Sequence, residues 1–204
     1  MKIRNSQLKY LILLVFLAHQ AVWTASARAQ AMATLRGVVS APTPKNRANA
    51  VISLKPTGKA PSIVKTAHMD QKGLVFTPRV LPIQKGSAVA FLNSDPVAHS
   101  VFSNDGEKYD LGTWPQGQTR NYTFQKTGIY RQLCRVHDDM IAFIVVLETP
   151  YFAVSDKAGE FAITGLPPGS YTMTIWHEKL ASPERAVTVV AGDNPPVQIA
   201  LGAR

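Results

Sequence analysis

The amino-acid sequence of 204 residues predicts an all-β protein built from β-sandwiches. Two observations predict this class. Beyond residue 31, no apolar residues recur at helical spacing over a useful length. Short alternating runs rich in Val, Ile, Tyr and Phe occur instead, and Gly, Pro, Asn or Asp clusters separate them. Clear examples are TLRGVVS, NAVISLKP, SAVAFLN and IAFIVVLE. Such runs are typical of strands that bury one face against a second sheet.

Residues 1–31 have the order of residues found in a secretory signal. Three basic residues precede the apolar run YLILLVFLA, and the small residues of ASARAQA follow it. The apolar run has roughly half the length that a membrane-spanning helix needs. We therefore expect cleavage near Ala29 or Ala31, export to the periplasm, and no membrane span after cleavage.

The charge of the remaining chain argues against a nucleic-acid partner. Removing residues 1–31 takes away four basic residues and no acidic ones, so the formal net charge falls from +9 to +5. The other basic residues are scattered singly, and no Lys/Arg cluster is interleaved with aromatic residues. A charge of this kind tunes solubility or an encounter with an acidic partner.

The carboxyl-terminal segment predicts strands joined by tight turns. YFAVSDKAGEFAITGLPPGSYTMTIW contains three strands separated by a turn at residues 156–159 and a Pro-Pro-Gly turn, and RAVTVVAGDNPPVQIAL adds two more. The turn Asp and Gly, the aromatic that follows and the Leu-Pro-Pro-Gly-x-Tyr motif resemble those of carboxypeptidase regulatory-like modules. The resemblance implies a small β-sandwich of transthyretin type.

The first two strands of such a module lie far upstream in this chain, in RGVVSAPTPKNRANAVISLKP. We therefore expect residues 33–57 and 150–204 to form one discontinuous sandwich, with residues 60–149 inserted into it. Insertion at a surface turn is tolerated when the inserted unit has its own core and closely spaced ends. The alternative is two consecutive domains, in which the first strands belong to the middle unit.

Cys134 is the only cysteine, and His137 and Met140 follow it at spacings of three. In an oxidising compartment a lone thiol is a buried cysteine, an intermolecular link or a metal ligand. A thiolate, two imidazoles and a weak thioether suit a mononuclear copper site for electron transfer, because this set serves both Cu(I) and Cu(II). The cluster supplies three of these four groups.

His99 is the strongest candidate for the missing imidazole. AVAFLNSDPVAHSVF indicates a strand, a polar turn, and a histidine that opens a second strand. The loop with Cys134 also lies between two predicted strands, GIYRQLC and IAFIVVLE. If both strand ends meet at one pole of a sandwich, the four side chains converge. His68 and His177 lie outside these loops, and we expect neither to bind the metal.

Residues 65–149 resemble a cupredoxin, the family of plastocyanin, pseudoazurin and amicyanin. GLVFTPRVLPIQKGSAVAFLNSD is similar to the opening of that family, and GQTRNYTFQKTGIYRQLC is similar to its later strand pair. The Cys-x-x-His-x-x-Met spacing is that of the short amicyanin loop. The resemblance implies a Greek-key β-sandwich that holds one type 1 copper ion. Its ligands would be His99, Cys134 and His137, with Met140 as the long axial ligand.

The resemblance also assigns roles beside the ligands. Asn93 would tie the two ligand loops together by hydrogen bonds, and His137 would be the electron port at the surface. Three features depart from the family pattern. Ser100 stands where an asparagine often follows the first histidine, and its hydroxyl can still form a hydrogen bond. Gln132 stands where cupredoxins carry an apolar side chain facing the core, so its amide needs partners. Asp138 and Asp139 lie where the amicyanin loop has apolar residues.

These observations predict an exported copper protein that carries single electrons between redox partners, such as a c-type cytochrome or a dehydrogenase. The alternative is a copper-binding adaptor or delivery module that docks to a larger periplasmic complex. Multicopper oxidases and copper nitrite reductases need further histidines, and the sequence has no His-x-His pair. We therefore do not expect an enzyme. Proteins of this two-part build resemble those of bacterial methylamine-utilisation pathways.

Overall fold

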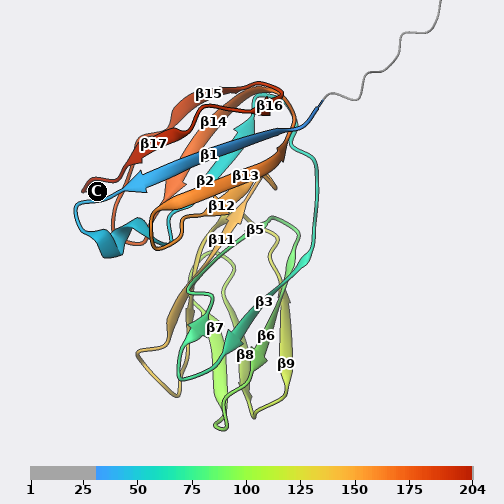
Figure 1. Cartoon of the computed structure of the whole chain (residues 1–204). Helices are drawn as coiled ribbons and strands as arrows, with labels where there is room; N and C mark the ends of the chain where they lie inside the picture. The colour runs from blue at the N-terminus through green and yellow to red at the C-terminus, as the bar shows by residue number, and fades with distance from the viewer. Residues whose placement is uncertain (1–30, 204) are drawn as a thin grey trace, which may run out of the picture. The chain divides into compact units, whose positions relative to one another are not determined.

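A computed structural model describes residues 31–203 and confirms the predicted all-β class. The predicted signal peptide lies outside the described residues, apart from Ala31. The only helix in the described part of the chain is the short 3-10 helix η1 (Pro44–Arg47). Within residues 31–203, no helix has the length and the apolar character needed to cross a membrane. The strands form two sandwiches, which Figure 1 shows with their labels.

The terminal sandwich contains strands from both ends of the described chain. One sheet has the order β13-β1-β16, with β17 also on β1, and the other has the order β12-β2-β14-β15. Its strands are β1 (Ala33–Ser40), β2 (Val51–Pro56), β12 (Phe152–Val154), β13 (Glu160–Leu166), β14 (Gly169–Trp176), β15 (Arg185–Val189), β16 (Gly192–Asp193) and β17 (Val197–Ala200).

Strands far apart in the sequence pair within the terminal sandwich. β1 lies between β13 and β17 (Figure 1), and it pairs with β13 in antiparallel register, with Leu35 opposite Ile163. β2 pairs with β14 in the same way. The alternating pattern of β1 turns Leu35 into a core that also contains Ile52, Leu166 and Met173. These pairings support our proposal that residues 33–57 and 150–204 form one domain around an inserted unit.

The central sandwich has its own core. Its two sheets have the orders β5-β11-β10-β7-β8 and β4-β3-β6-β9. The largest fully buried side chains between them are Trp114, Tyr130, Phe91 and Phe124. Its strands are β3 (Thr66–Gln71), β4 (Phe76–Thr77), β5 (Val80–Gln84), β6 (Ala88–Asn93), β7 (His99–Ser103), β8 (Tyr109–Trp114), β9 (Thr119–Thr123), β10 (Gly128–Leu133) and β11 (Ile141–Leu147).

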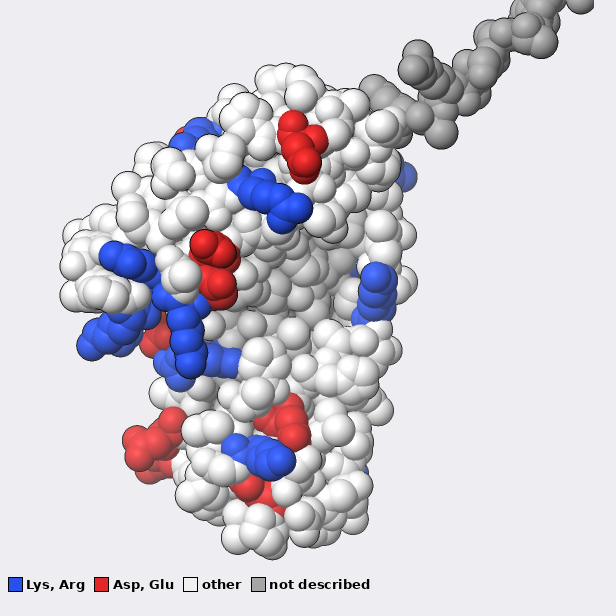
Figure 2. All heavy atoms as spheres, in the orientation of Figure 1, with Lys and Arg blue, Asp and Glu red and all other residues white. Residues whose placement is uncertain are grey.

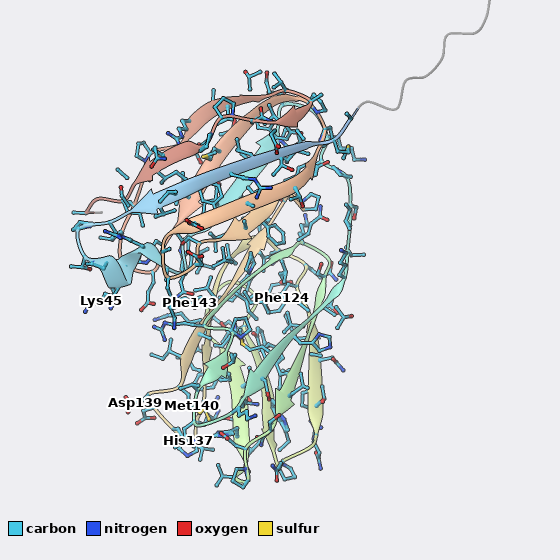
Figure 3. All side chains as sticks on the ribbon, in the orientation of Figure 1. Lys45, Phe124, His137, Asp139, Met140 and Phe143 are labelled. Atoms are coloured by element: carbon cyan, nitrogen blue, oxygen red, sulfur yellow. The ribbon has the colours of Figure 1, made fainter. Side chains whose placement is uncertain are left out.

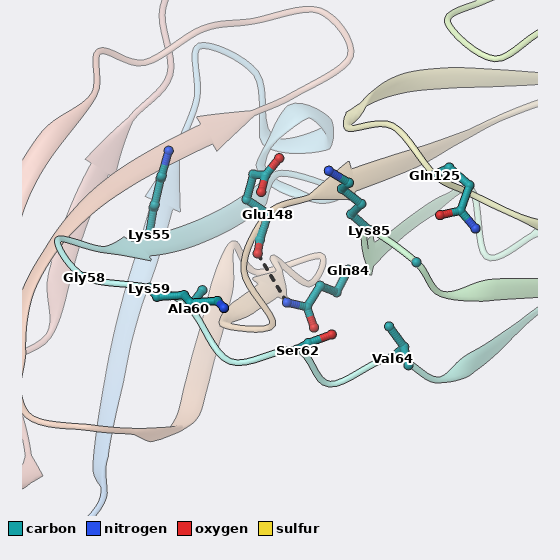
Figure 4. Close-up of a pocket in the computed structure, with 11 residues that line it drawn as sticks. Lys55, Gly58, Lys59, Ala60, Ser62, Val64, Gln84, Lys85, Gln125 and Glu148 are labelled. Atoms are coloured by element: carbon teal, nitrogen blue, oxygen red, sulfur yellow. Dashed lines mark hydrogen bonds between the residues drawn. The ribbon is translucent and has the colours of Figure 1, made fainter.

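Two connections join the sandwiches, one between β2 and β3 and one between β11 and β12. The side chain of Gln84 forms hydrogen bonds with both. Its Oε1 accepts a hydrogen bond from the amide of Ile63 at 2.6 Å, and its Nε2 donates to the carbonyl of Pro61 at 2.7 Å. Nε2 also donates to the carbonyl of Glu148 at 3.2 Å, as Figure 4 shows. Gln84 is buried, so these bonds satisfy an amide that would otherwise be costly to remove from water. They hold the connection that contains Pro61 and Ile63 against the connection that contains Glu148.

Gly159 gives a stability test of the terminal sandwich. Its φ is +90°, and a Cβ there would overlap the carbonyl oxygen of Val39. We expect Gly159→Ala to lower the free energy of unfolding by about 2–4 kcal/mol, measured by urea denaturation, because it adds a clash to backbone strain. Gly165 is the matched control, since its φ is +68° but open space surrounds its Cβ position. Gly165→Ala should cost about 1 kcal/mol, and equal losses would contradict the clash.

Candidate metal centre

Strand pairing brings His99 to the loop that contains Cys134. β7 begins at His99, and β10 ends at Leu133, one residue before Cys134. The two strands are antiparallel neighbours, with Leu133 opposite Phe102. The start of β7 therefore lies beside the end of β10, as the sequence predicted.

Three of the four predicted ligands meet there. Nδ1 of His99 lies 3.9 Å from Sγ of Cys134 and 3.2 Å from Nδ1 of His137. All three ligand atoms lie within 4.8 Å of one another. His99 and Cys134 are buried, whereas His137 is half-buried and reaches the surface. In the described part of the chain, no other group of three or more His, Cys, Asp or Glu residues is arranged to hold a metal.

The spacing of these atoms fits one metal ion. Imidazole nitrogen binds transition metals at about 2.0 Å and thiolate sulfur at about 2.3 Å. Atoms separated by 3.2 and 3.9 Å can therefore share a single ion. One soft thiolate with two imidazoles is a donor set that suits copper.

Met140, the fourth predicted ligand, lies at the end of the loop that carries Cys134 and His137. It is buried in the same apolar cluster as Cys134, and its amide donates to the carbonyl of His137 at 3.1 Å, which closes the loop into a turn. Figure 3 places His137, Asp139 and Met140 together at one end of the central sandwich. The loop thus keeps the thioether inside while His137 stays at the surface.

The surroundings of Cys134 favour its thiolate. Burial raises the pKa of the thiol, but hydrogen bonds to the backbone of Ser100, Val136 and His137 and to the His99 side chain outweigh burial. The result is a pKa of about 6. At neutral pH the sulfur is therefore mostly deprotonated, which is the state that binds metals.

Asn93 supports the site differently from what the resemblance implied. Its Nδ2 donates to the carbonyls of Val97 and Trp114 at 2.9 and 3.0 Å, and its Oδ1 accepts from the amide of Asp95 at 3.0 Å. These bonds brace the segment before His99. The tie between the two ligand loops is made by the residue after His99 instead.

Ser100 makes that tie between the loops. Its hydroxyl donates to Sγ of Cys134 at 3.8 Å and accepts from the amide of Arg135 at 2.8 Å. Ser100 is fully buried on β7, so both bonds are shielded from water. Ser100 therefore takes the role predicted for Asn93, because it directly follows His99 and its hydroxyl reaches the loop of Cys134.

Asp95 is a part of the site that sequence reasoning missed. Its Oδ2 lies 2.8 Å from Nε2 of His99, and its carboxylate also accepts hydrogen bonds from the amides of Gly73 and Leu74 at 2.6 and 2.9 Å. Burial raises the pKa of this carboxyl, but hydrogen bonds from the two amides and the interaction with His99 lower it by more. The net pKa is therefore below its ordinary value, and the carboxyl is ionised. The negative carboxylate of Asp95 holds the ring proton of His99 on Nε2. The other ring nitrogen, Nδ1, then faces Cys134. The signal in the sequence that could have revealed this contact is an acidic residue four positions before His99.

Gln132, the polar residue predicted in place of an apolar core residue, has hydrogen-bond partners. The hydroxyl of Tyr109 donates to its Oε1, and its Nε2 donates to the carbonyl of Tyr130 at 3.0 Å. Tyr109 in turn stacks on Tyr122 with ring centroids 4.0 Å apart. The buried amide is thus satisfied locally, and β10 needs no shift in register.

The family model of the carboxypeptidase regulatory-like domain matches residues 142–202. It covers β11 and the strands of the terminal sandwich that follow it. This confirms the predicted regulatory-like module in the carboxyl-terminal part of the chain. No curated protein matches the sequence.

Solved structures that resemble the chain include a copper-containing nitrite reductase from Thermus scotoductus, with 26% identity and a TM-score of 0.40. That match covers 47% of this chain but only 25% of the reductase. A purple cupredoxin from Nitrosopumilus maritimus matches with 20% identity and a TM-score of 0.37, over 40% of this chain and 99% of its own. A Cu(I) amicyanin mutant matches with 17% identity and a TM-score of 0.39, over 47% and 98%. Both resemblances predicted from the sequence recur in these comparisons.

Proposed function

We propose that the protein is an exported, periplasmic type 1 copper protein that carries single electrons between redox partners, such as a c-type cytochrome or a dehydrogenase. The observation that carries this proposal is the convergence of His99, Cys134 and His137 at a spacing that fits one ion. One bound copper ion would supply one-electron chemistry by alternating between Cu(II) and Cu(I). Met140, buried in the same apolar cluster as Cys134, would be the fourth and weaker ligand.

The residues around the cluster support electron transfer because they hold the ligands still. Asp95 fixes the ring of His99, and Ser100 links that strand to Cys134. Ligands that are already in place rearrange little when an electron arrives or leaves, so less energy is needed for the transfer. His137 is the ligand that reaches the surface, and we assign it as the point where electrons pass to a partner.

The second candidate function is a copper-binding adaptor or delivery module. The regulatory-like sandwich favours it, because no metal cluster of the described residues lies in that sandwich, so binding of a metal does not account for its presence. The two sandwiches are joined by an ion pair, with Arg79 on one side and Glu178 on the other at 2.8 Å, and by packing of Phe143 against Trp176. A larger complex that bound one sandwich would therefore hold the other.

A two-part experiment separates these functions. Mature protein loaded with one equivalent of Cu(II) should show an intense visible charge-transfer band from thiolate to copper. Stopped-flow mixing with a c-type cytochrome should then show fast, reversible electron exchange with the copper retained. A colourless loaded protein would rule out a type 1 site. A coloured protein that exchanges electrons slowly but gives its copper to an acceptor protein would favour the adaptor.

A further inference from the structure

A cavity of about 460 Å³ lies where Gln84 holds the two connections between the sandwiches together (Figure 4). Residues between 58 and 64 line it from the first connection, and Glu148 lines it from the second. Lys55 on β2 and Lys85, directly after β5, add side chains from the terminal and the central sandwich. None of the described residues assigned to the metal centre contributes to this lining. A ligand in the cavity would therefore contact both sandwiches and none of the metal ligands.

Positive charge dominates the lining of this cavity. Its charged residues are Lys55, Lys59, Lys85 and Glu148, so the lining carries three positive charges and one negative charge. In the described part of the chain no lysine forms an ion pair, so an unpaired lysine by itself is not unusual. These three differ from the others because they share one cavity. Like charges in one cleft repel each other and raise the local concentration of anions.

Glu148 does not neutralise the lysines beside it. In Figure 4 its side chain projects between those of Lys55 and Lys85. It nevertheless forms no ion pair with either lysine among the described residues. The backbone carbonyl of Glu148, rather than its carboxylate, accepts the hydrogen bond from Gln84 at 3.2 Å. Each lysine ammonium group therefore keeps its three N–H donors for a ligand.

The first connection adds backbone donors to the cavity. The amides of residues 58–60, which line it, donate to no group in the part of the chain that the structure describes. The amides on either side of them are fixed. That of Thr57 donates to the carbonyl of Ser170 at 3.1 Å, and that of Ile63 donates to Oε1 of Gln84 at 2.6 Å. Successive backbone N–H groups bind anions in many proteins, so this short segment can supplement the lysines.

Paired strands hold the backbone of the charged residues in place before a ligand binds. β5 and β11 are parallel neighbours, with Gln84 opposite Leu147. The amide of Lys85 then donates to the carbonyl of Leu147 at 2.8 Å, one residue before Glu148. Lys55 lies within β2, which pairs with β14. Binding to side chains on a fixed backbone costs less conformational entropy than binding to a mobile loop.

We propose that this cavity binds a small anion that carries two or more negative charges on oxygen atoms, as a polycarboxylate or a phosphate does. Three lysines and one carboxylate leave two positive charges, so a dianion balances the lining, whereas a monoanion leaves one charge uncompensated. Lys55 and Lys85 belong to different sandwiches, so the bound anion joins the two. The site is independent of the metal centre and of the proposed electron transfer.

Isothermal titration calorimetry tests the site with two probes, propane-1,2,3-tricarboxylate and inorganic phosphate, on the mature protein without copper. At low ionic strength, where screening is weak, at least one probe should bind with a Kd on the order of 1 mM or tighter. Acetate, a monoanion, should bind about tenfold more weakly or worse. Binding of the tricarboxylate alone assigns a polycarboxylate site, and binding of phosphate alone assigns a phosphate site. If neither probe binds more tightly than acetate, the proposal is refuted.

Matched variants identify the charges responsible. Lys55→Gln with Lys85→Gln should weaken binding of the probe about tenfold, because hydrogen bonds between charged groups are the strong ones. Glu148→Gln should tighten it about twofold, because it removes the one negative charge of the lining. The control, Lys45→Gln with Lys157→Gln, removes two charges from exposed positions outside the cavity. Figure 2 shows that basic side chains also gather near the place where Figure 3 labels Lys45. The control should change the Kd less than about twofold, and equal weakening by both pairs would refute the site.

Two-dimensional NMR of the backbone amides locates the bound probe. Titration should shift the amides of residues 58–60 and of Gly86, which line the cavity, and leave those around His137 unchanged. The largest shifts around His137 would place the anion at the metal centre and overturn the inference. Loading with one equivalent of Cu(II) should leave the Kd unchanged. A protein that binds the probe in the cavity but shows no visible copper band would uphold this inference while the proposed function fails.

Discussion

Cys134→Ser is expected to abolish the visible charge-transfer band of the copper-loaded protein and its one-electron exchange. Serine keeps the size of the side chain, but its hydroxyl is neither a soft ligand nor ionised at neutral pH. Copper affinity should fall by more than about 100-fold, since loss of groups that only support ligands already costs about 10- to 100-fold. Visible absorption and equilibrium copper binding measure both effects.

His68 provides the control for this substitution. It is exposed on β3 and lies outside the group formed by His99, Cys134 and His137. His68→Ala should keep the band and the affinity, and far-UV circular dichroism should show the same strand content in both variants. If the serine variant retained the band, Cys134 would not be a ligand and the copper proposal would be wrong.

Asp95→Ala is expected to have the second large effect, on stability and on reduction potential together. The change removes the partner of three donors, namely Nε2 of His99, which is buried, and the amides of Gly73 and Leu74, whose bonds to the carboxylate are partly buried. The loss of three hydrogen bonds to a charged carboxylate, one of them fully buried, should lower the free energy of unfolding by about 3–5 kcal/mol. The midpoint potential should rise, because the carboxylate favours the more highly charged Cu(II) state.

Two further variants separate these contributions. Asp95→Asn keeps a side-chain oxygen for the amides, so it should recover part of the stability while the potential stays raised. Asp110→Ala breaks the exposed ion pair with Arg135, and such a pair contributes only about 0–1 kcal/mol. A loss of stability at Asp95 no larger than the loss at Asp110 would show that the hydrogen bonds of Asp95 contribute little to stability. Urea denaturation and protein-film voltammetry provide the two measurements.

Most of the fold was predictable because its signals are local. The alternating runs become strands β1, β2, β6 and β11, and the Gly and Pro clusters become turns. The spacing of Cys134, His137 and Met140 was also readable, since one short loop carries all three. His99 required more: it lies on another strand, and its place beside Cys134 depends on the pairing of β7 with β10.

The contacts that the sequence did not reveal are those between distant segments. Asp95 is recognisable as a partner of His99 only when the turn at Gly73 and Leu74 supplies amides to it. Gln132 is satisfied by Tyr109, which lies 23 residues away. In both cases one polar side chain had many conceivable partners, and only packing of the sheets selected one. The family resemblance placed the tie between the loops at Asn93, whereas the structure places it at Ser100.

The pairing of β1 and β2 with strands near the other end of the chain also has a consequence for the order of folding. β1 and β2 pair with strands that lie more than 100 residues later in the sequence. Contacts between residues so far apart in sequence form slowly. The segments on either side of the central sandwich nevertheless lie together, since the hydroxyl of Thr149 donates to the carbonyl of Leu54, 95 residues away, at 2.8 Å. Once the central sandwich has folded, it acts as a short rigid link, and much less loop-closure entropy remains to be lost. We therefore expect folding from the middle outward to be the faster route for this chain, and substitutions in the central core to slow the formation of both sandwiches.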